Sequence, residues 1–382
     1  MKVLITGGTG TISSGLVKEC VSKKYETYAI TRGLNNSRNI AGATYLKCDV
    51  WNVDEMSKVL EDNQFDVVVE CLAYNVKQLQ ISLTNFASKT KQYIFISSAS
   101  IYNHIGNQRI KETDKKELIE WAYTKNKIQC ENYLKNYSEE KGLKYTIVRP
   151  TVTYGNYRIP FPIITRTPSW TFFDRLQKGK LMLASDNVLF SIIHIDDFSK
   201  MVIALFNNPQ AINEDFHITS NDNDIYWDDV IKEGAKILEV EPKIIHVSSE
   251  TFKKLWPSMY NELKYHKNNT QIFDDTKIKT VTKINTELNL EEGMRKIIPS
   301  MEKEYFSKNM SLDEKWNTYC NAVIFYAYKN NLLNSNEMIL VEEYIKANGI
   351  KEFKDSINAV KKDNMQAKKK AVIHKLKTLL KI

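Results

Sequence analysis

The first 150 residues alternate between short apolar runs and longer segments with helical periodicity. Several of the apolar runs contain no alternating polar residues, which is typical of strands buried on both faces of a sheet. This rhythm predicts a parallel, doubly wound α/β sheet with helices on both sides. We expect strands at 3–6, 27–30, 44–47, 66–71, 93–97 and 145–148, and helices at 13–22, 53–63, 79–89 and 123–141.

The rhythm changes after Arg149-Pro150, where the proline-rich stretch 158–170 predicts a loop. Short strand and helix patterns then mix up to about residue 301, and the chain is helical from about residue 311. We expect amphipathic helices at 314–330, 336–348 and 351–362, with the basic tail as a separate fourth helix. The predicted domains are 1–157, a smaller discontinuous α+β lobe at 158–305 that returns strands to the core, and a helical extension at 306–382.

Composition and charge narrow the class of protein. The chain has 382 residues, 42% of them hydrophobic, which is enough for sizeable cores. Residues 361–382 contain eight lysines and one acid, so this tail carries seven of the eight net positive charges. Any affinity for nucleic acid or an anionic surface would therefore rest on the tail.

Membrane, secretion and metal signals are not found in the sequence. It has no run of 18 uncharged apolar residues and no signal-peptide pattern at its start, so we expect a cytoplasmic protein. The five cysteines are scattered without metal-ligand spacing, and we expect reduced thiols and no metal site.

A glycine cluster between the first predicted strand and helix, in "LITGGTGTISSGL" (4–16), indicates a phosphate site. Glycines at such a turn allow positive φ and close backbone approach, and the N–H groups of a helix N-terminus attract an anion. The pyrophosphate of a dinucleotide fits this position, with Gly7, Gly10, Thr11 and Ile12 as the binding residues. Arg32 follows the second strand, where an acid would favour NAD. Its guanidinium favours the 2′-phosphate of NADP, unless it is an ordinary solvated arginine.

Two further motifs predict acid–base chemistry. "ISSASIY" (96–102) ends a predicted strand, and "YTKNK" (123–127) opens the next long helix. Tyr123 and Lys127 are four residues apart and share one helix face. A nearby ammonium lowers the pKa of a phenol, so that Tyr123 could take a proton from a substrate hydroxyl while hydride leaves the same carbon. Ser98 would hold the reacting oxygen.

The spacing Gly7-x-x-Gly10-x-x-Ser13 resembles the TGxxGxxG signature of the extended short-chain dehydrogenases/reductases, the NAD-dependent epimerase/dehydratase family, with serine for the third glycine. The order Ser98, Tyr123, Lys127 is also that family's. The resemblance implies a Rossmann-type fold that binds NADP or NAD. It also implies that Asp49 and Val50 contact the adenine, that Leu72 and Ala73 line the cofactor, and that Tyr123 and Lys127 touch it. It selects Ser98 among the neighbouring serines.

The resemblance also suggests the reaction. Family dehydratases carry Asp-Glu after the catalytic serine or threonine, where this chain has Ala99-Ser100, which resembles sugar 4-epimerases. We therefore expect an epimerase acting on a nucleotide-linked sugar, with an NADP(H)-dependent keto-sugar reductase as the alternative. "FSIIHIDDFSK" (190–200) is similar to the family's RDYIHVxD segment, but Phe190 stands where an arginine usually binds the diphosphate. Arg158, Arg166 and Arg175 are the candidates to replace that arginine, and the sequence does not choose among them.

Later segments of residues 1–300 resemble a divergent branch of the family that is also similar to chloroplast stem-loop RNA-binding proteins. An RNA-binding protein on a dehydrogenase fold is therefore the rival interpretation. The family often dimerises through two helices, which here would be 79–89 and 123–141.

Overall fold

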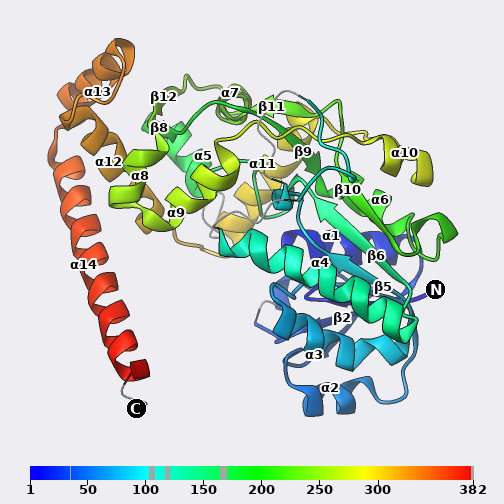
Figure 1. Ribbon diagram of the computed structural model, residues 1–382. Helices are drawn as coiled ribbons and strands as arrows, with labels where there is room; N and C mark the ends of the chain where they lie inside the picture. The colour runs from blue at the N-terminus through cyan, green and yellow to red at the C-terminus, as the bar shows by residue number, and fades with distance from the viewer. Residues whose placement is uncertain (35, 103–107, 117–120, 164–169, 380–382) are drawn as a thin grey trace. The chain divides into compact units, whose positions relative to one another are not determined.

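The computed structural model describes residues 1–34, 36–102, 108–116, 121–163 and 170–379 (Figure 1). The chain forms two compact units. The first consists of Met1–Pro160, Leu189–Ile225 and Asn269–Ile297, and the second of Phe161–Val188, Tyr226–Asn268 and Ile298–Ile382. The three domains proposed from the sequence, with their two boundaries, stay a prediction.

A seven-stranded parallel sheet forms the centre of the first unit, in the order β10-β6-β5-β4-β1-β2-β3 (Figure 1). Crossing from β1 to β4 reverses the direction of winding, so the sheet is doubly wound and the α/β prediction is confirmed. Its strands are β1 (Lys2–Thr6), β2 (Glu26–Thr31), β3 (Thr44–Lys47), β4 (Phe65–Glu70), β5 (Thr90–Ile96), β6 (Tyr145–Pro150) and β10 (Glu214–Ile218).

Both faces of this sheet are apolar because successive side chains of each strand enter different cores. Val3 and Ile5 pack with helix residues such as Leu16 and Phe198, whereas Leu4 packs on the opposite face with residues such as Leu134. One face is covered by α1 (Thr11–Ser22) and α6 (Ile195–Ile203), and the other by α2 (Val53–Leu60), α3 (Val76–Phe86) and α4 (Ala122–Lys141).

The helix predicted to begin at residue 79 begins at Val76, because the side chain of Asn75 caps it by accepting a hydrogen bond from Gln78 N–H at 3.0 Å. The remaining elements of the first unit are β7 (Val152–Tyr154), β9 (Leu189–His194) and α10 (Thr276–Thr282), with β11 (Asp224–Tyr226) beginning at its border; β7, β9 and β11 form a small second sheet. Helix α11 (Leu290–Ser307) contributes residues to both units.

The second unit contains a two-stranded parallel sheet and most of the C-terminal helices. Its elements are α5 (Trp170–Gln177), β8 (Leu181–Ala184), α7 (Trp227–Ile237), β12 (Lys243–His246), α8 (Ser249–Leu255), α9 (Pro257–Glu262), α12 (Glu314–Lys329), α13 (Ser335–Asn348) and α14 (Lys351–Leu379). No helix in the described ranges combines the length and apolar character that a bilayer-crossing segment needs.

The prediction of a separate fourth helix for the basic tail is wrong. Residues 351–379 form the single helix α14. The change from an amphipathic to a lysine-rich pattern suggested a break, but this stretch contains neither glycine nor proline. Charge alone does not end a helix, whereas a glycine or proline would.

Candidate active site

Every residue predicted for catalysis or cofactor binding lies in the first unit, at the carboxyl ends of its parallel strands or in the first turns of α1 and α4. The glycine turn follows β1 and leads into α1. Gly7 and Gly8 both have positive φ, at 99° and 100°. A Cβ on Gly8 would lie 2.8 Å from the Cβ of Ala29, and one on Gly7 would lie 3.1 Å from Ser13 Oγ. These two glycines are therefore required by the chain's own packing and conformation.

Gly10 is different, because nothing in the described part of the chain requires it to be glycine. Its φ is −85°, which any residue adopts, and it is exposed. The nearest atom to a Cβ built there is Ser13 Oγ, at an ordinary contact distance of 3.5 Å. The absent side chain leaves the N-terminal turn of α1 open, which is what a ligand phosphate needs.

The first turn of α1 fits an anion. Helix α1 starts at Thr11, its first turn has no acidic residue, and no side chain caps it at Gly10. The N–H groups of Thr11 and Ile12 lack helical carbonyl partners by their position. Ser13, which replaces the third glycine of the motif, uses its hydroxyl inside the turn, where Oγ accepts a hydrogen bond from Gly10 N–H at 3.2 Å.

The predicted adenine and ribose residues follow the next two strands. Arg32 comes directly after β2 and is exposed, so its guanidinium can reach a ligand phosphate. Asp49 is exposed shortly after β3, and its carboxylate accepts a hydrogen bond from Trp51 N–H at 3.1 Å. Val50 beside it is 4% exposed and belongs to the core.

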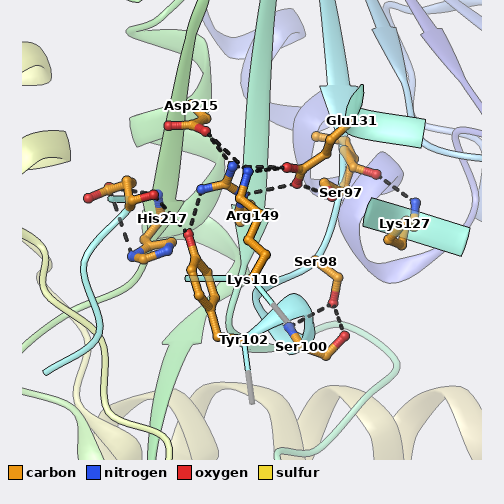
Figure 2. A network of polar contacts seen from close by, with 12 residues as sticks. Ser97, Ser98, Ser100, Tyr102, Lys116, Lys127, Glu131, Arg149, Asp215 and His217 are labelled. Carbon is orange, nitrogen blue, oxygen red and sulfur yellow. Dashed lines mark hydrogen bonds and ion pairs between the residues drawn. The ribbon is translucent and has the colours of Figure 1, made fainter. Parts of the chain in front are cut away.

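The serines after β5 have separate roles. Ser97 is buried, and its hydroxyl donates to Glu131 Oε1 at 2.6 Å. Ser98 is partly exposed, and its Oγ lies 2.8 Å from Ser100 Oγ and accepts from Ser100 N–H at 3.2 Å (Figure 2). Because the buried Ser97 hydroxyl is hydrogen-bonded to Glu131, Ser98 is the serine at this strand end that can contact a substrate.

Lys127 is held in one position below the site. Its ammonium donates to the carbonyls of Ala73 and Ile96, both at 2.9 Å, and the residue is 2% exposed. An ammonium has three donors, so one remains after these two bonds. Burial lowers the pKa of Lys127 to about 8, against the opposing influence of nearby acidic groups and thiols.

Aromatic rings surround the predicted base. Tyr123 lies one helical turn before Lys127 on α4. Its ring centroid is 6.1 Å from that of Tyr74 and 5.1 Å from that of Trp121. The Lys127 nitrogen is 5.0 Å from the Tyr74 centroid, so Tyr74 neighbours both the base and the ammonium.

A buried ionic network anchors α4 beneath this site (Figure 2). Arg149, at 0% exposure, donates from Nε and a terminal nitrogen to the two oxygens of Glu131, both at 2.9 Å. It also donates to the Tyr102 hydroxyl at 2.6 Å and to the Asp215 carboxylate. Lys116 donates to Glu131 Oε2 at 2.8 Å. Every charge in the network therefore has a partner.

The network sets the charge of its members. Burial opposes ionisation of Glu131, but the charges and hydrogen bonds of Arg149 and Lys116 outweigh it and lower the pKa of Glu131 to about 2. His217 packs edge-on against Tyr102 at 5.1 Å between centroids, and burial lowers its pKa to about 3. It is therefore neutral beside a charged network.

Comparisons with known proteins identify relatives of this chain in both sequence and structure. The sequence model of the NAD dependent epimerase/dehydratase family matches residues 3–219, more than half of the chain. The chain belongs to this family. Its cofactor is therefore NAD or NADP, and the open helix N-terminus at Gly10 fits the pyrophosphate of either. The fold is that of the extended short-chain dehydrogenases/reductases.

A curated relative is the chloroplastic divinyl chlorophyllide a 8-vinyl-reductase of Cucumis sativus, 30% identical over 167 residues. The match covers 40% of this chain and 39% of that protein, so the chain aligns with about two fifths of its relative's length. UDP-glucose 4-epimerase of Thermotoga maritima, solved with UDP-glucose, has a TM-score of 0.65 at 19% identity, covering 81% of this chain and all of the other. UDP-glucose 4-epimerase of Thermus thermophilus, solved with NAD, has a TM-score of 0.65 at 14% identity, covering 79% and 99%.

The substrate side departs from the family pattern. Phe190, at the family's arginine position, is fully buried. Arg175, considered as a replacement, is buried in the second unit, where it donates to Leu181 O, Asn317 and Asn321. It is a structural residue of that unit. Of the other two candidates, Arg158 is exposed in the first unit, and Arg166 lies outside the described residues.

His194 of the same segment caps a helix. Its Nδ1 accepts a hydrogen bond from Asp196 N–H at 3.2 Å at the start of α6. Burial lowers the pKa of His194 to about 4, which keeps it neutral and able to accept.

Four residues around the site were not singled out from the sequence, namely Glu70, Trp121, Glu131 and Arg149. Glu131 follows Lys127 by one turn and Tyr123 by two, so the helix period alone places it on their face. Glu70 and Arg149 are charged residues near the ends of mostly buried strands, and a buried charge in such a strand indicates a specific partner.

The two kinds of glycine can be separated by substitution. We expect Gly10→Ala to change the free energy of unfolding by less than about 0.5 kcal/mol and to weaken NAD and NADP binding at least about tenfold. Gly8→Ala, the matched control, should lose about 1–3 kcal/mol of stability through its clash with Ala29. Urea unfolding and calorimetric titration measure both. Equal destabilisation by the two variants would contradict the assignment of Gly10 to the ligand.

The buried network gives a stability prediction. Arg149→Met leaves Glu131 and Asp215 without their main cation, and we expect it to lower the free energy of unfolding by about 3–5 kcal/mol near pH 7. Arg295→Met removes an exposed pair with Glu291 and should cost less than about 1 kcal/mol.

The same network makes stability pH-dependent. The pKa of Glu131 falls from 4.5 to about 2 on folding, so its contribution is present above pH 4.5 and is lost as pH falls through about 2. The difference between wild type and Arg149→Met should therefore shrink in acid. An undiminished difference would show that Arg149 does not act through Glu131.

Proposed function

We propose that the protein is an NAD(P)-dependent epimerase that acts on a nucleotide sugar by transient oxidation and return of hydride. One observation carries this proposal. The Lys127 ammonium is fixed by Ala73 O and Ile96 O one turn from Tyr123, at the end of the strand that presents Ser98. The proposed cofactor residues are Gly7, Gly10, Thr11, Ile12, Arg32, Asp49, Val50, Leu72, Ala73, Tyr123 and Lys127.

The proposed mechanism assigns one task to each residue. A bound nicotinamide would supply the hydride acceptor, and afterwards the hydride donor, for the sugar carbon. Tyr123, as phenolate, takes the proton of the hydroxyl on that carbon. Lys127 stabilises the phenolate by its positive charge. Ser98 Oγ holds the reacting oxygen during both half-reactions, and its neighbour Ser100 orients that hydroxyl.

Epimerisation is favoured over dehydration because Ala99 and Ser100 bring no carboxylate next to Ser98, and expulsion of water needs an acid there. The similarity to the Thermotoga epimerase supports a sugar substrate. Dimerisation through α3 and α4 and the cytoplasmic location remain part of the proposal.

A keto-sugar reductase using NADPH is the second candidate. Arg32 is exposed at the end of β2, where it can meet a 2′-phosphate. The buried Phe190 supplies no charge for a sugar diphosphate. The curated relative named for a reductase reaction also supports this alternative.

An RNA-binding role is the rival from another class. Lysines 361, 362, 368, 369 and 370 are exposed on α14, and none is in an ion pair found in the described ranges. Such a basic face could contact the phosphates of RNA or another anionic surface.

Tyr123→Phe tests the acid–base proposal. We expect turnover of a nucleotide sugar to fall by at least about 10²–10⁴-fold, with dinucleotide affinity unchanged, because only the hydroxyl is removed. Tyr137→Phe on the same helix is the control and should keep full activity. Normal turnover by Tyr123→Phe would rule out Tyr123 as the base.

The nucleotide that the protein retains separates the three candidates. An epimerase regenerates its cofactor in each cycle, so we expect NAD or NADP to be released in near-stoichiometric amount when the purified protein is denatured and analysed by mass. An empty protein that binds NADPH would favour the reductase. An empty protein that binds neither dinucleotide but binds RNA with steep salt dependence would favour the rival.

A further inference from the structure

Glu70 ends strand β4 with a buried carboxylate that the proposed reaction does not use. Its Oε1 accepts hydrogen bonds from Leu72 N–H at 2.6 Å, Ala73 N–H at 2.9 Å and the Thr6 hydroxyl at 2.9 Å. Its Oε2 accepts from the hydroxyl of Ser82 on α3. An ionised carboxylate only accepts hydrogen bonds, and these four donors match it.

The donors to Glu70 belong to the parts that form the candidate site. Thr6 directly precedes Gly7 of the phosphate turn. Leu72 borders the same turn, because a Cβ on Gly7 would lie 3.5 Å from Leu72 Cδ2. Ala73 presents its carbonyl to the Lys127 ammonium at 2.9 Å. One carboxylate thus fixes the strand before the phosphate turn, the loop after β4 and, through Ala73, the catalytic lysine.

The charge of Glu70 also matters to Lys127. The ammonium is buried, with the rings of Tyr74 and Phe95 at 5.0 and 4.7 Å from its nitrogen, and burial disfavours its charged form. The titratable groups that face it are Cys130, Glu70, Cys71 and Glu131. Burial raises the pKa of both thiols, so they are uncharged near pH 7 and the two carboxyl groups are the ones that can oppose this effect on Lys127. Glu131 already accepts hydrogen bonds from the cations Arg149 and Lys116. Within the described ranges, the hydrogen-bond partners of Glu70 are all neutral and no ion pair neutralises its carboxylate.

We propose that Glu70 is a positioning residue for hydride transfer, which holds the loop of Leu72 and Ala73 against the cofactor and keeps Lys127 charged and in place. The inference rests on the proposed function, since Lys127 serves hydride transfer only if Tyr123 is the base.

Glu70→Gln tests the effect of the charge with little change of shape. The glutamine carbonyl can accept the bonds made to Oε1, and its amide can donate to Ser82. The probe is the NMR signal of Lys127 in protein labelled with [ε-¹³C]lysine, assigned by its absence in Lys127→Arg. We expect the titration midpoint of Lys127 to fall by about one pH unit or more in Glu70→Gln.

Asp66→Asn is the matched control. Asp66 is near the other end of β4, where it binds Lys2 N–H and Lys91, and its neutralisation should leave the Lys127 midpoint unchanged. An unchanged midpoint in Glu70→Gln, or an equal fall in Asp66→Asn, would overturn the proposal. The titration needs neither cofactor nor turnover, so it tests Glu70 even if the proposed reaction is wrong.

Glu70→Asp tests the contacts separately from the charge. It keeps the carboxylate but withdraws it from Leu72 and Ala73, and we expect the dissociation constants of NAD and NADP to rise about tenfold. If Glu70→Gln does not fold, Glu70→Asp by itself tests whether Glu70 positions the loop and Lys127. A folded Glu70→Asp with wild-type cofactor affinity and a wild-type Lys127 midpoint would overturn the proposal. Wild-type protein that binds neither dinucleotide would instead contradict the proposed function.

Discussion

The buried ion pair between Glu131 and Arg149 fixes the helix that carries Tyr123 and Lys127. A guanidinium and a carboxylate meet through two hydrogen bonds in a site that water does not reach. Removing two such charges from water is costly, and the cost is offset only where every remaining donor and acceptor finds a partner. Ser97, Tyr102, Lys116 and Asp215 supply those partners. The result is a single orientation of α4 relative to the ends of β5 and β6.

Two carboxylates thus act on Lys127 from different sides. Glu131 immobilises the helix on which the lysine stands, and Glu70 immobilises the loop whose carbonyl receives it. A lysine side chain has four rotatable bonds, and fixing both its base and its tip removes most of that freedom before a substrate arrives. The site therefore owes its geometry to residues that need not touch the substrate.

The sequence predicts the central sheet because buried parallel strands leave a local pattern. The site motifs are also local patterns, and the roles given to their residues stay a prediction. Apolar runs without alternating polar residues can be found directly in the sequence. The glycine turn and the four-residue spacing of Tyr123 and Lys127 can be found in the same way. The partners of Glu70 are harder to predict, since Thr6 and Ser82 are distant in sequence and nothing local links them to it. The glycines of the cluster also differ in the roles that the structure gives them. Gly7 and Gly8 serve the conformation of the turn, while the openness expected for a ligand is found at Gly10.

The place of β10 has a consequence for how the chain folds during synthesis. Residues 146–150 of β6 pair with residues 214–218, more than sixty positions later. Until that later strand emerges from the ribosome, β6 is an open sheet edge with unpaired N–H and C=O groups. Arg149 then also lacks Asp215, which β10 carries. Completion of the ionic network and pairing of β6 with β10 are thus one event. Until residues 214–218 leave the ribosome, β6 is an exposed edge at which another chain can pair.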